Sequence, residues 1–133
     1  MPHERKEIAS EVEAIIRKTL QRDLPEITEE TTLFGDLGVG SLDLLEIIYE
    51  IEEVFDIEVA PDHIIPRKLL RDPEYVQDGC LTSKGYARLK EQYSFTKLPV
   101  LPPSMPVVEV AKRILTFGGV IDYFQSLIDA EDG

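Results

Sequence analysis

The chain has 133 residues, of which 43% are hydrophobic, and a formal net charge of −12 at pH 7. This length suits one ordinary domain with a real hydrophobic core, and no apolar run approaches the roughly 20 residues of a transmembrane helix. Cys80 is the only cysteine, and His3 and His63 are the only histidines, which excludes an internal disulfide and a cysteine metal cluster. We expect a single domain, residues 1–133, that is soluble, cytoplasmic, monomeric and without a metal site.

The first half of the chain predicts two helices joined by a long loop. Apolar residues at helical spacing predict a helix over about 4–21 with one buried stripe, and Pro25 helps to end it. The segment from Leu24 to Gly40 reads as a loop that is long for a compact domain, a feature typical of functional loops. Four of its apolar residues are expected to fold back on the core: Ile27, Leu33, Phe34 and Leu37. A second helix is predicted from Ser41 to Phe55, with a core face of Leu44, Ile47, Ile48, Ile51 and Phe55.

The segment after residue 61 is irregular and rich in proline. Leu69 and Leu70 indicate a short helix, and Thr82 is a candidate N-cap for a helix that runs to about Tyr93. The apolar, proline-rich stretch 98–106 is expected to lie across the surface and to cover the core beside the second helix. No strand pattern competes with these helices.

Two more helices are predicted at the C-terminal end. Pro106 suits the start of the first of them, with Ser104 as its cap. Thr116 is the expected cap of the last helix, whose residues from Asp129 onward should fray. The sequence therefore predicts an all-α fold.

The acidic residues are concentrated in the first loop and the second helix. Thirteen of the 26 acids lie between Asp23 and Pro66, a range that contains no lysine or arginine. On the second helix, each pair of like charges at i,i+3 or i,i+4 destabilises the helix by about 0.2–0.5 kcal/mol. A partner protein with a basic surface would reduce this repulsion. The alternative explanation is an acidic face that is simply solvated. The negative electrostatic potential of these acids disfavours binding to nucleic acid and to anionic membranes. The candidate partner-binding residues are Asp36, Asp43, Glu46, Glu50 and Glu53.

A glycine-rich loop, residues 35–40, delivers Ser41 to the start of the second helix. A phosphate-binding GxxxxGK[ST] loop is excluded because its lysine is missing and two nearby aspartates would repel phosphate. A calcium loop beginning at Asp36 is excluded because Ile47 stands where the twelfth-position glutamate belongs. Serine is also a preferred helix N-cap, so simple capping remains an alternative explanation of Ser41.

The triplet Gly40-Ser41-Leu42, with the flanking runs 32–38, 44–57 and 115–123, resembles the acyl carrier protein family. The mark of that family is Asp-Ser-Leu at the start of its second helix, and Gly40 departs from it. The resemblance implies a four-helix bundle formed by residues 4–61 and 106–130. A helical and extended insertion, about 62–106, would separate the second and third core helices.

The resemblance also implies a carrier protein that is not an enzyme. The Ser41 hydroxyl would be esterified to 4′-phosphopantetheine, which makes the chain a phosphoprotein, with Gly40 and Leu42 beside the attachment point. Acyl groups would travel as thioesters on the thiol of this arm, without membrane insertion. The family's acyl pocket maps onto Leu42, Leu45, Ile48, Val120 and Phe124.

The implied partners are a phosphopantetheinyl transferase and acyl-transferring, synthase or ligase enzymes with basic docking surfaces. The insertion favours a specialised fatty-acyl or lipid biosynthetic pathway. Alternatives are an aminoacyl or peptidyl carrier and an unmodified interaction module of the same fold. The insertion could enlarge the acyl cavity with its aromatic residues, or Arg67, Lys68 and Arg71 could supply counter-charge to the acidic helix.

Overall fold

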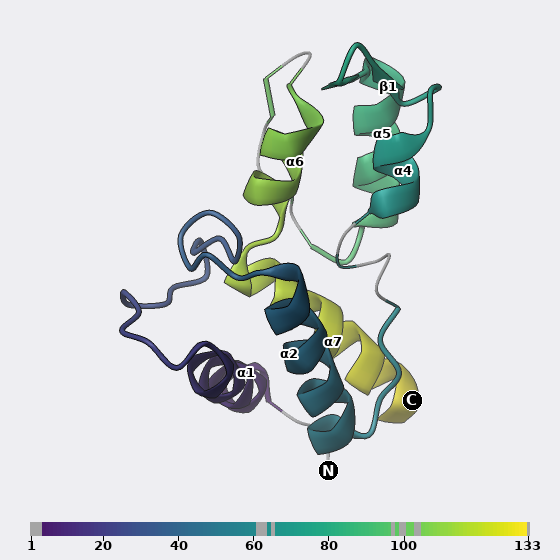
Figure 1. Cartoon of the computed structure of the whole chain (residues 1–133). Coiled ribbons are helices and arrows are strands. Elements are labelled where there is room, and N and C mark those ends of the chain that lie inside the picture. The colour runs from purple at the N-terminus through teal and green to yellow at the C-terminus, as the bar shows by residue number, and fades with distance from the viewer. Residues whose placement is uncertain are drawn as a thin grey trace.

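The computed structural model describes residues 4–60, 64, 66–96, 98, 101–102 and 105–132. Its helices fall into two groups, one above the other in Figure 1. The lower group is a bundle of α1 (Arg5–Leu20), α2 (Ser41–Phe55) and α7 (Phe117–Asp132). The upper group contains α4 (Arg67–Arg71), α5 (Ser83–Gln92), α6 (Val107–Ile114) and the short strands β1 (Val76–Gln77) and β2 (Cys80–Leu81). The predicted helical bundle is confirmed.

The lower bundle has its own hydrophobic core, in which α1 packs against both α2 and α7. Each helix contributes one apolar face, and the core face predicted for α2 is confirmed residue by residue. The first loop closes one side of this core, as predicted, with Leu33, Leu37 and Val39 buried and Ile27 and Phe34 packed against them. Burying such side chains contributes about 1.5–3 kcal/mol each, so the loop is an integral part of the bundle.

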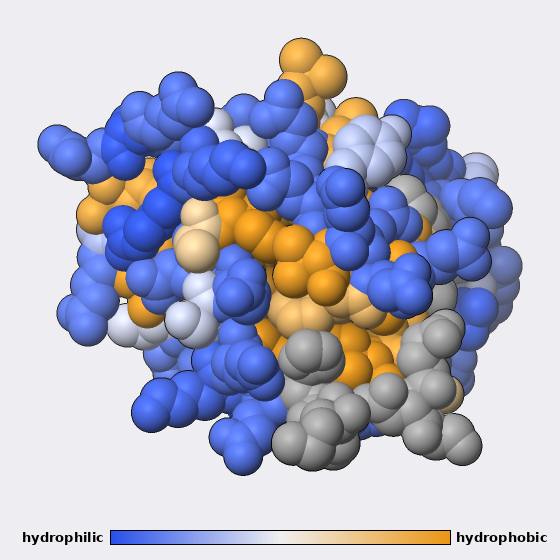
Figure 2. Space-filling view, turned by 90° about the horizontal axis from the view of Figure 1, so that it is seen from below, coloured by the Kyte–Doolittle hydropathy of each residue, from blue (hydrophilic) through white to orange (hydrophobic). Residues whose placement is uncertain are grey.

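One face of the molecule has apolar residues at its surface. Figure 2 views the face at the bottom of Figure 1, where apolar residues gather in the middle with hydrophilic residues around them. Among the described residues, no helix is both long enough and apolar enough to cross a bilayer.

The upper group forms a second hydrophobic cluster. Leu69 of α4, Leu81 of β2 and Leu89 of α5 are its buried centre. Val110 and Ile114 of α6 belong to this cluster, whereas the sequence analysis assigned residues 106–130 as a whole to the main core. Leu101 and Met105 are also buried in it, so these parts of the proline-rich stretch cover the second cluster and not the surface beside α2. Ser104, the expected cap of α6, lies outside the described residues.

A β-hairpin is the element that the sequence analysis did not predict. β1 and β2 pair antiparallel, with Val76 opposite Leu81 and Gln77 opposite Cys80. The two turn residues, Asp78 and Gly79, have φ of 53° and 75°, as type I′ hairpin turns require. The Leu81 N–H donates to the Met105 carbonyl at 2.9 Å, which ties the hairpin to the segment that leads into α6.

The predicted caps of α5 and α7 are confirmed, whereas α6 begins at Val107 with Pro106, and not the expected Ser104, at its N-cap position. The Thr82 hydroxyl accepts a hydrogen bond from the Gly85 N–H at 3.0 Å and begins α5. The Thr116 hydroxyl accepts one from the Gly119 N–H at 3.0 Å and begins α7. The helix then continues to Asp132, past the point where fraying was expected.

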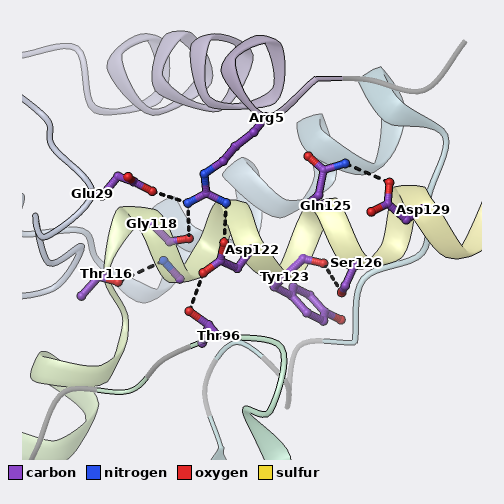
Figure 3. A network of polar contacts seen from close by, with 11 residues as sticks. Arg5, Glu29, Thr96, Thr116, Gly118, Asp122, Tyr123, Gln125, Ser126 and Asp129 are labelled. Carbon is purple, nitrogen blue, oxygen red and sulfur yellow. Dashed lines mark hydrogen bonds and ion pairs between the residues drawn. The ribbon is translucent and has the colours of Figure 1, made fainter.

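A seam of aromatic and polar contacts joins the two groups. The Phe95 ring packs against both clusters, and its centroid lies 5.2 Å from that of Tyr123 on α7. The Thr96 hydroxyl donates to Asp122 at 2.5 Å. Asp122 also pairs with Arg5, which in turn contacts Glu29 and the Gly118 carbonyl (Figure 3). The ion pair with Glu29, followed by that with Asp122, raises the pKa of Arg5.

Candidate functional site

The loop that leads to Ser41 is held by a dense set of hydrogen bonds. Thr32 and Asp36 exchange two bonds, from the Thr32 N–H to the Asp36 carboxylate and from the Asp36 N–H to the Thr32 hydroxyl, each 2.9 Å. The Val39 N–H donates to the Leu33 carbonyl at 2.9 Å, and the Leu33 N–H donates to the Leu115 carbonyl at 3.0 Å. These bonds fix the end of the loop against the start of α7.

Two residues determine how the last turn of this loop is built. Gly38 has φ +65°, in the left-handed region where residues other than glycine are strained. The Arg22 guanidinium donates to the Leu37 carbonyl and, at 3.1 Å, to the Gly38 carbonyl. The loop therefore needs a glycine at this position and a donor such as Arg22 that satisfies the carbonyl groups around it by hydrogen bonds.

Ser41 is the first helical residue of α2 and not its cap. Gly40 occupies the N-cap position with extended backbone angles, and the Asp43 carboxylate accepts from the Gly40 N–H at 3.0 Å. The Ser41 side chain is exposed and makes no hydrogen bond to any described residue. The capping explanation of this serine is therefore wrong, because Asp43 does that work from the third helical position.

The position of Ser41 suits a phosphate ester. The first backbone N–H groups of α2 lack intrahelical partners, and the helix dipole places partial positive charge there. A phosphodiester on Ser41 would lie at this end of the helix with its substituent in solvent. A Cβ at Gly40 would lie 3.3 Å from the Asp43 carboxylate, so a larger residue at this position would press on the side chain that accepts the Gly40 N–H.

The five predicted partner-binding acids have different environments. Glu46 and Glu53 are exposed and form no ion pair with a described residue, whereas the Asp36 carboxylate holds the loop. Asp43 is half-buried. Glu50 pairs with Lys18 of α1 at 3.1 Å, so the acidic helix receives some counter-charge from within the chain, worth about 0.2–1 kcal/mol for an exposed pair.

The expected counter-charge from α4 is not seen for two of its three bases. Arg67 and Arg71 are exposed, and neither forms an ion pair with an acid of α2 in the described part of the chain. No group of three or more histidine, cysteine, aspartate or glutamate side chains in the same part could hold a metal ion.

The residues assigned to the acyl pocket do not lie together. Ile48, Val120 and Phe124 are buried in the core of the lower bundle, with exposed fractions of 4%, 5% and 1%. Leu42 and Leu45 are instead on the surface, 79% and 40% exposed. Leu42 therefore borders Ser41 without lining the interior.

The sequence analysis missed one exposed residue of α2. Tyr49 is 65% exposed and follows Leu42 and Leu45 at helical spacing, so the three form an apolar stripe beside Glu46 and Glu53. The signal was present in the sequence, because five other residues of the helix already fill its core face. An apolar stripe flanked by acids is a mixed surface of the kind that protein interfaces use.

The sequence around Ser41 is similar to a known protein family and to individual acyl carrier proteins. Residues 10–65 match a protein family described as "Phosphopantetheine attachment site". The acyl carrier protein of Thermotoga maritima is 42% identical over 55 residues, which are 41% of this chain and 68% of that protein. The acyl carrier protein of Coprothermobacter proteolyticus is 33% identical over 81 residues, 61% of this chain and 99% of that protein. No solved structure matches the chain.

Proposed function

The chain belongs to the acyl carrier protein family, whose cofactor is covalently attached 4′-phosphopantetheine, and we propose that Ser41 carries this cofactor. The observation that supports the assignment most strongly is the exposed Ser41 hydroxyl at the start of α2, with the capping role taken by Asp43. A serine that neither caps the helix nor bonds to its surroundings is free to react. This argues against an unmodified interaction module.

The chemistry requires a separate transferase. Its active site would deprotonate the Ser41 hydroxyl, whose oxygen then attacks the phosphorus next to the pantetheine of coenzyme A. The bond between that phosphorus and the bridging oxygen breaks, and adenosine 3′,5′-bisphosphate leaves. The chain contributes position, since Gly38 and Arg22 fix the loop in front of the serine. The dipole at the α2 N-terminus offsets part of the repulsion between the covalently attached phosphodiester and the Asp36 and Asp43 carboxylates.

Intact-protein mass spectrometry tests this assignment. After incubation with coenzyme A and a broad-specificity phosphopantetheinyl transferase, the protein should gain the mass of one phosphopantetheine. A Ser41→Ala variant should gain nothing, and Ser83→Ala, which changes an exposed serine at the start of α5, should react like the natural protein. Modification of the Ser41→Ala variant would refute the assignment.

The docking surface of the carrier is proposed to be the exposed side of α2. Glu46 and Glu53 flank the stripe of Leu42, Leu45 and Tyr49, so basic enzyme surfaces would be steered by charge and held by apolar contact. Neutralising both glutamates (Glu46→Gln, Glu53→Gln) should lower the association rate with the transferase, most strongly at low salt. Asp78→Asn removes a charge from the hairpin turn and should have no such effect; equal losses would contradict the proposal.

The cargo is proposed to be a fatty-acyl group of a specialised lipid pathway. The second hydrophobic cluster, which adds aromatic surface next to the bundle, supports a cargo different from that of a plain carrier. An aminoacyl or peptidyl cargo remains the second candidate. Release of the thioester-bound group from protein isolated from its own cells, followed by mass spectrometry, would distinguish them.

A further inference from the structure

The second cluster and the rest of the chain carry charges of opposite sign. Residues 67–113, which contain α4, the hairpin, α5 and α6, hold nine of the 14 lysine and arginine residues and only five of the 26 acids, a net charge of +4. The remaining residues hold five bases and 21 acids, a net charge of −16. The overall charge of −12 therefore conceals a basic unit.

The acids of this basic unit, residues 67–113, are mostly engaged by groups of the unit itself. Three of the five form ion pairs inside it: Glu74 with Lys84 at 2.9 Å, Glu91 with Arg88 at 3.0 Å and Glu109 with Lys112 at 3.9 Å. The Asp72 carboxylate accepts a hydrogen bond from the Glu74 N–H at 2.9 Å. The unit thus has more basic side chains than acids to pair with, and positive charge is left over.

The remaining bases of α4 and α5 are at the surface. Leu69 of α4 and Leu89 of α5 are buried in the second cluster. Successive residues of a helix are about 100° apart, so Arg67 and Arg71, each two residues from Leu69, lie on the opposite side of α4. Both are exposed, as is Lys90 on α5, and none of the three forms an ion pair with a described acid. Because α4 and α5 contact each other, their exposed sides make one basic surface.

This basic surface belongs to the group of helices toward which the start of α2 points. In Figure 1, the N-terminal end of α2, where Ser41 lies, is the end nearer to the upper group. A standard protein interface buries about 800 Å² on each partner, a patch roughly 30 Å across. The 15 residues of α2 span only about 22 Å. An enzyme that docks around Ser41 can therefore reach beyond α2 to the upper group.

We propose that the basic surface is a second docking site, which binds an acidic patch on the same enzyme whose basic patch binds α2. The inference rests on the proposed function. A nucleic acid or an anionic membrane fits less well, because the −16 charge of the remaining residues repels a uniformly negative partner. A protein surface carries both signs of charge side by side. A carrier without the basic unit makes only one of the two contacts, so the second cluster selects the enzyme.

Site-specific photo-cross-linking in the protein's own cells tests the inference. The photo-reactive residue benzoylphenylalanine replaces either Ala87 or Tyr49. Ala87 is exposed on α5, two residues from both Gly85 and Leu89, which are buried, and Tyr49 is exposed on α2. Both positions should cross-link to one enzyme. Its cross-linked segment should be rich in aspartate and glutamate for position 87, and rich in lysine and arginine for position 49.

A matched pair of variants tests the charges themselves. Arg67→Gln with Arg71→Gln removes two charges from α4 and should lower the cross-linking yield from position 87 about fivefold, as expected for the loss of two exposed ion pairs. Lys6→Gln with Arg17→Gln removes the same net charge from exposed positions of α1 and should leave this yield unchanged. An unchanged yield in the α4 variant, or a cross-linked segment that is neutral or basic, would overturn the inference.

The same cross-links separate the second docking site from the proposed function. If position 49 cross-links to an enzyme and position 87 does not, or if the two reach different proteins, docking on α2 stands and the second site is overturned. If both reach one enzyme while Ser41 is never modified, the second site stands and the attachment proposal fails.

Two other probes test for a different class of partner. The purified protein is mixed with duplex DNA or with phosphatidylglycerol vesicles. Neither should bind it measurably at physiological salt. Binding of either probe that is lost in the Arg67→Gln, Arg71→Gln variant would overturn the inference in favour of a nucleic acid or a membrane.

Discussion

Replacing Gly38 by alanine tests whether the loop geometry is what presents Ser41. At φ +65°, a side chain costs about 1–2 kcal/mol of backbone strain. The new Cβ would also lie 3.2 Å from the Arg22 guanidinium, which must shift and weaken its bonds to the Leu37 and Gly38 carbonyls. Weakening these bonds of an exposed arginine without breaking them costs about 1 kcal/mol, less than the roughly 1.5–3 kcal/mol of an intact bond to a charged group. The free energy of unfolding should therefore fall by about 2–3 kcal/mol.

Gly79→Ala is the control for this prediction. Gly79 has φ +75° in the hairpin turn, and a Cβ at this position would meet no other atom within 4 Å, so only the strain of about 1–2 kcal/mol applies. Urea denaturation should show that Gly38→Ala loses about 1 kcal/mol more. The rate of phosphopantetheine transfer, measured on folded protein, should fall for Gly38→Ala alone. Equal stability losses and equal transfer rates would refute the role given to Arg22 and the loop.

Three further changes test other parts of the structure. Asp43→Ala removes the acceptor of the Gly40 N–H and should cost about 1 kcal/mol of unfolding free energy in urea titration, typical of a lost cap; no loss would contradict the capping arrangement. Burial raises the pKa of Tyr123, so its contribution to stability is complete below about pH 10 and is lost as the pH rises through the higher folded-state pKa. Tyr123→Phe should flatten this alkaline loss in thermal unfolding, and an unaltered pH dependence would refute it. In Gly85→Ala the new Cβ would lie 2.4 Å from the Tyr75 carbonyl oxygen, so α5 must move, at a cost of about 1–3 kcal/mol; a neutral urea titration would contradict this packing.

The sequence predicts the lower bundle well because its helices carry strong signals. The apolar residues of α1 and α2 recur with helical periodicity, and Thr116 stands where the cap of α7 was expected. The hairpin was missed although Asp78-Gly79 is a strong turn signal. Only two residues on each side pair, too few to form an alternating pattern, and the tie from Leu81 to Met105 is not visible in a linear sequence.

The candidate site was predicted in part. Ser41 and the acids of α2 follow from a local motif, so their places on one helix could be derived. The capping role of Asp43 depends on which side chain reaches the Gly40 N–H, and the pairing of Glu50 with Lys18 depends on how α1 crosses α2. Leu42 was assigned to the acyl pocket from its position in the family's motif, but other apolar residues already fill the core face of the helix and leave Leu42 on the surface.

The most direct measurement is peptide mass spectrometry of the protein purified from its own cells. The account predicts that the peptide containing Ser41 carries phosphopantetheine, free or acylated, on that serine. An unmodified Ser41, or phosphopantetheine on any other residue, would contradict it.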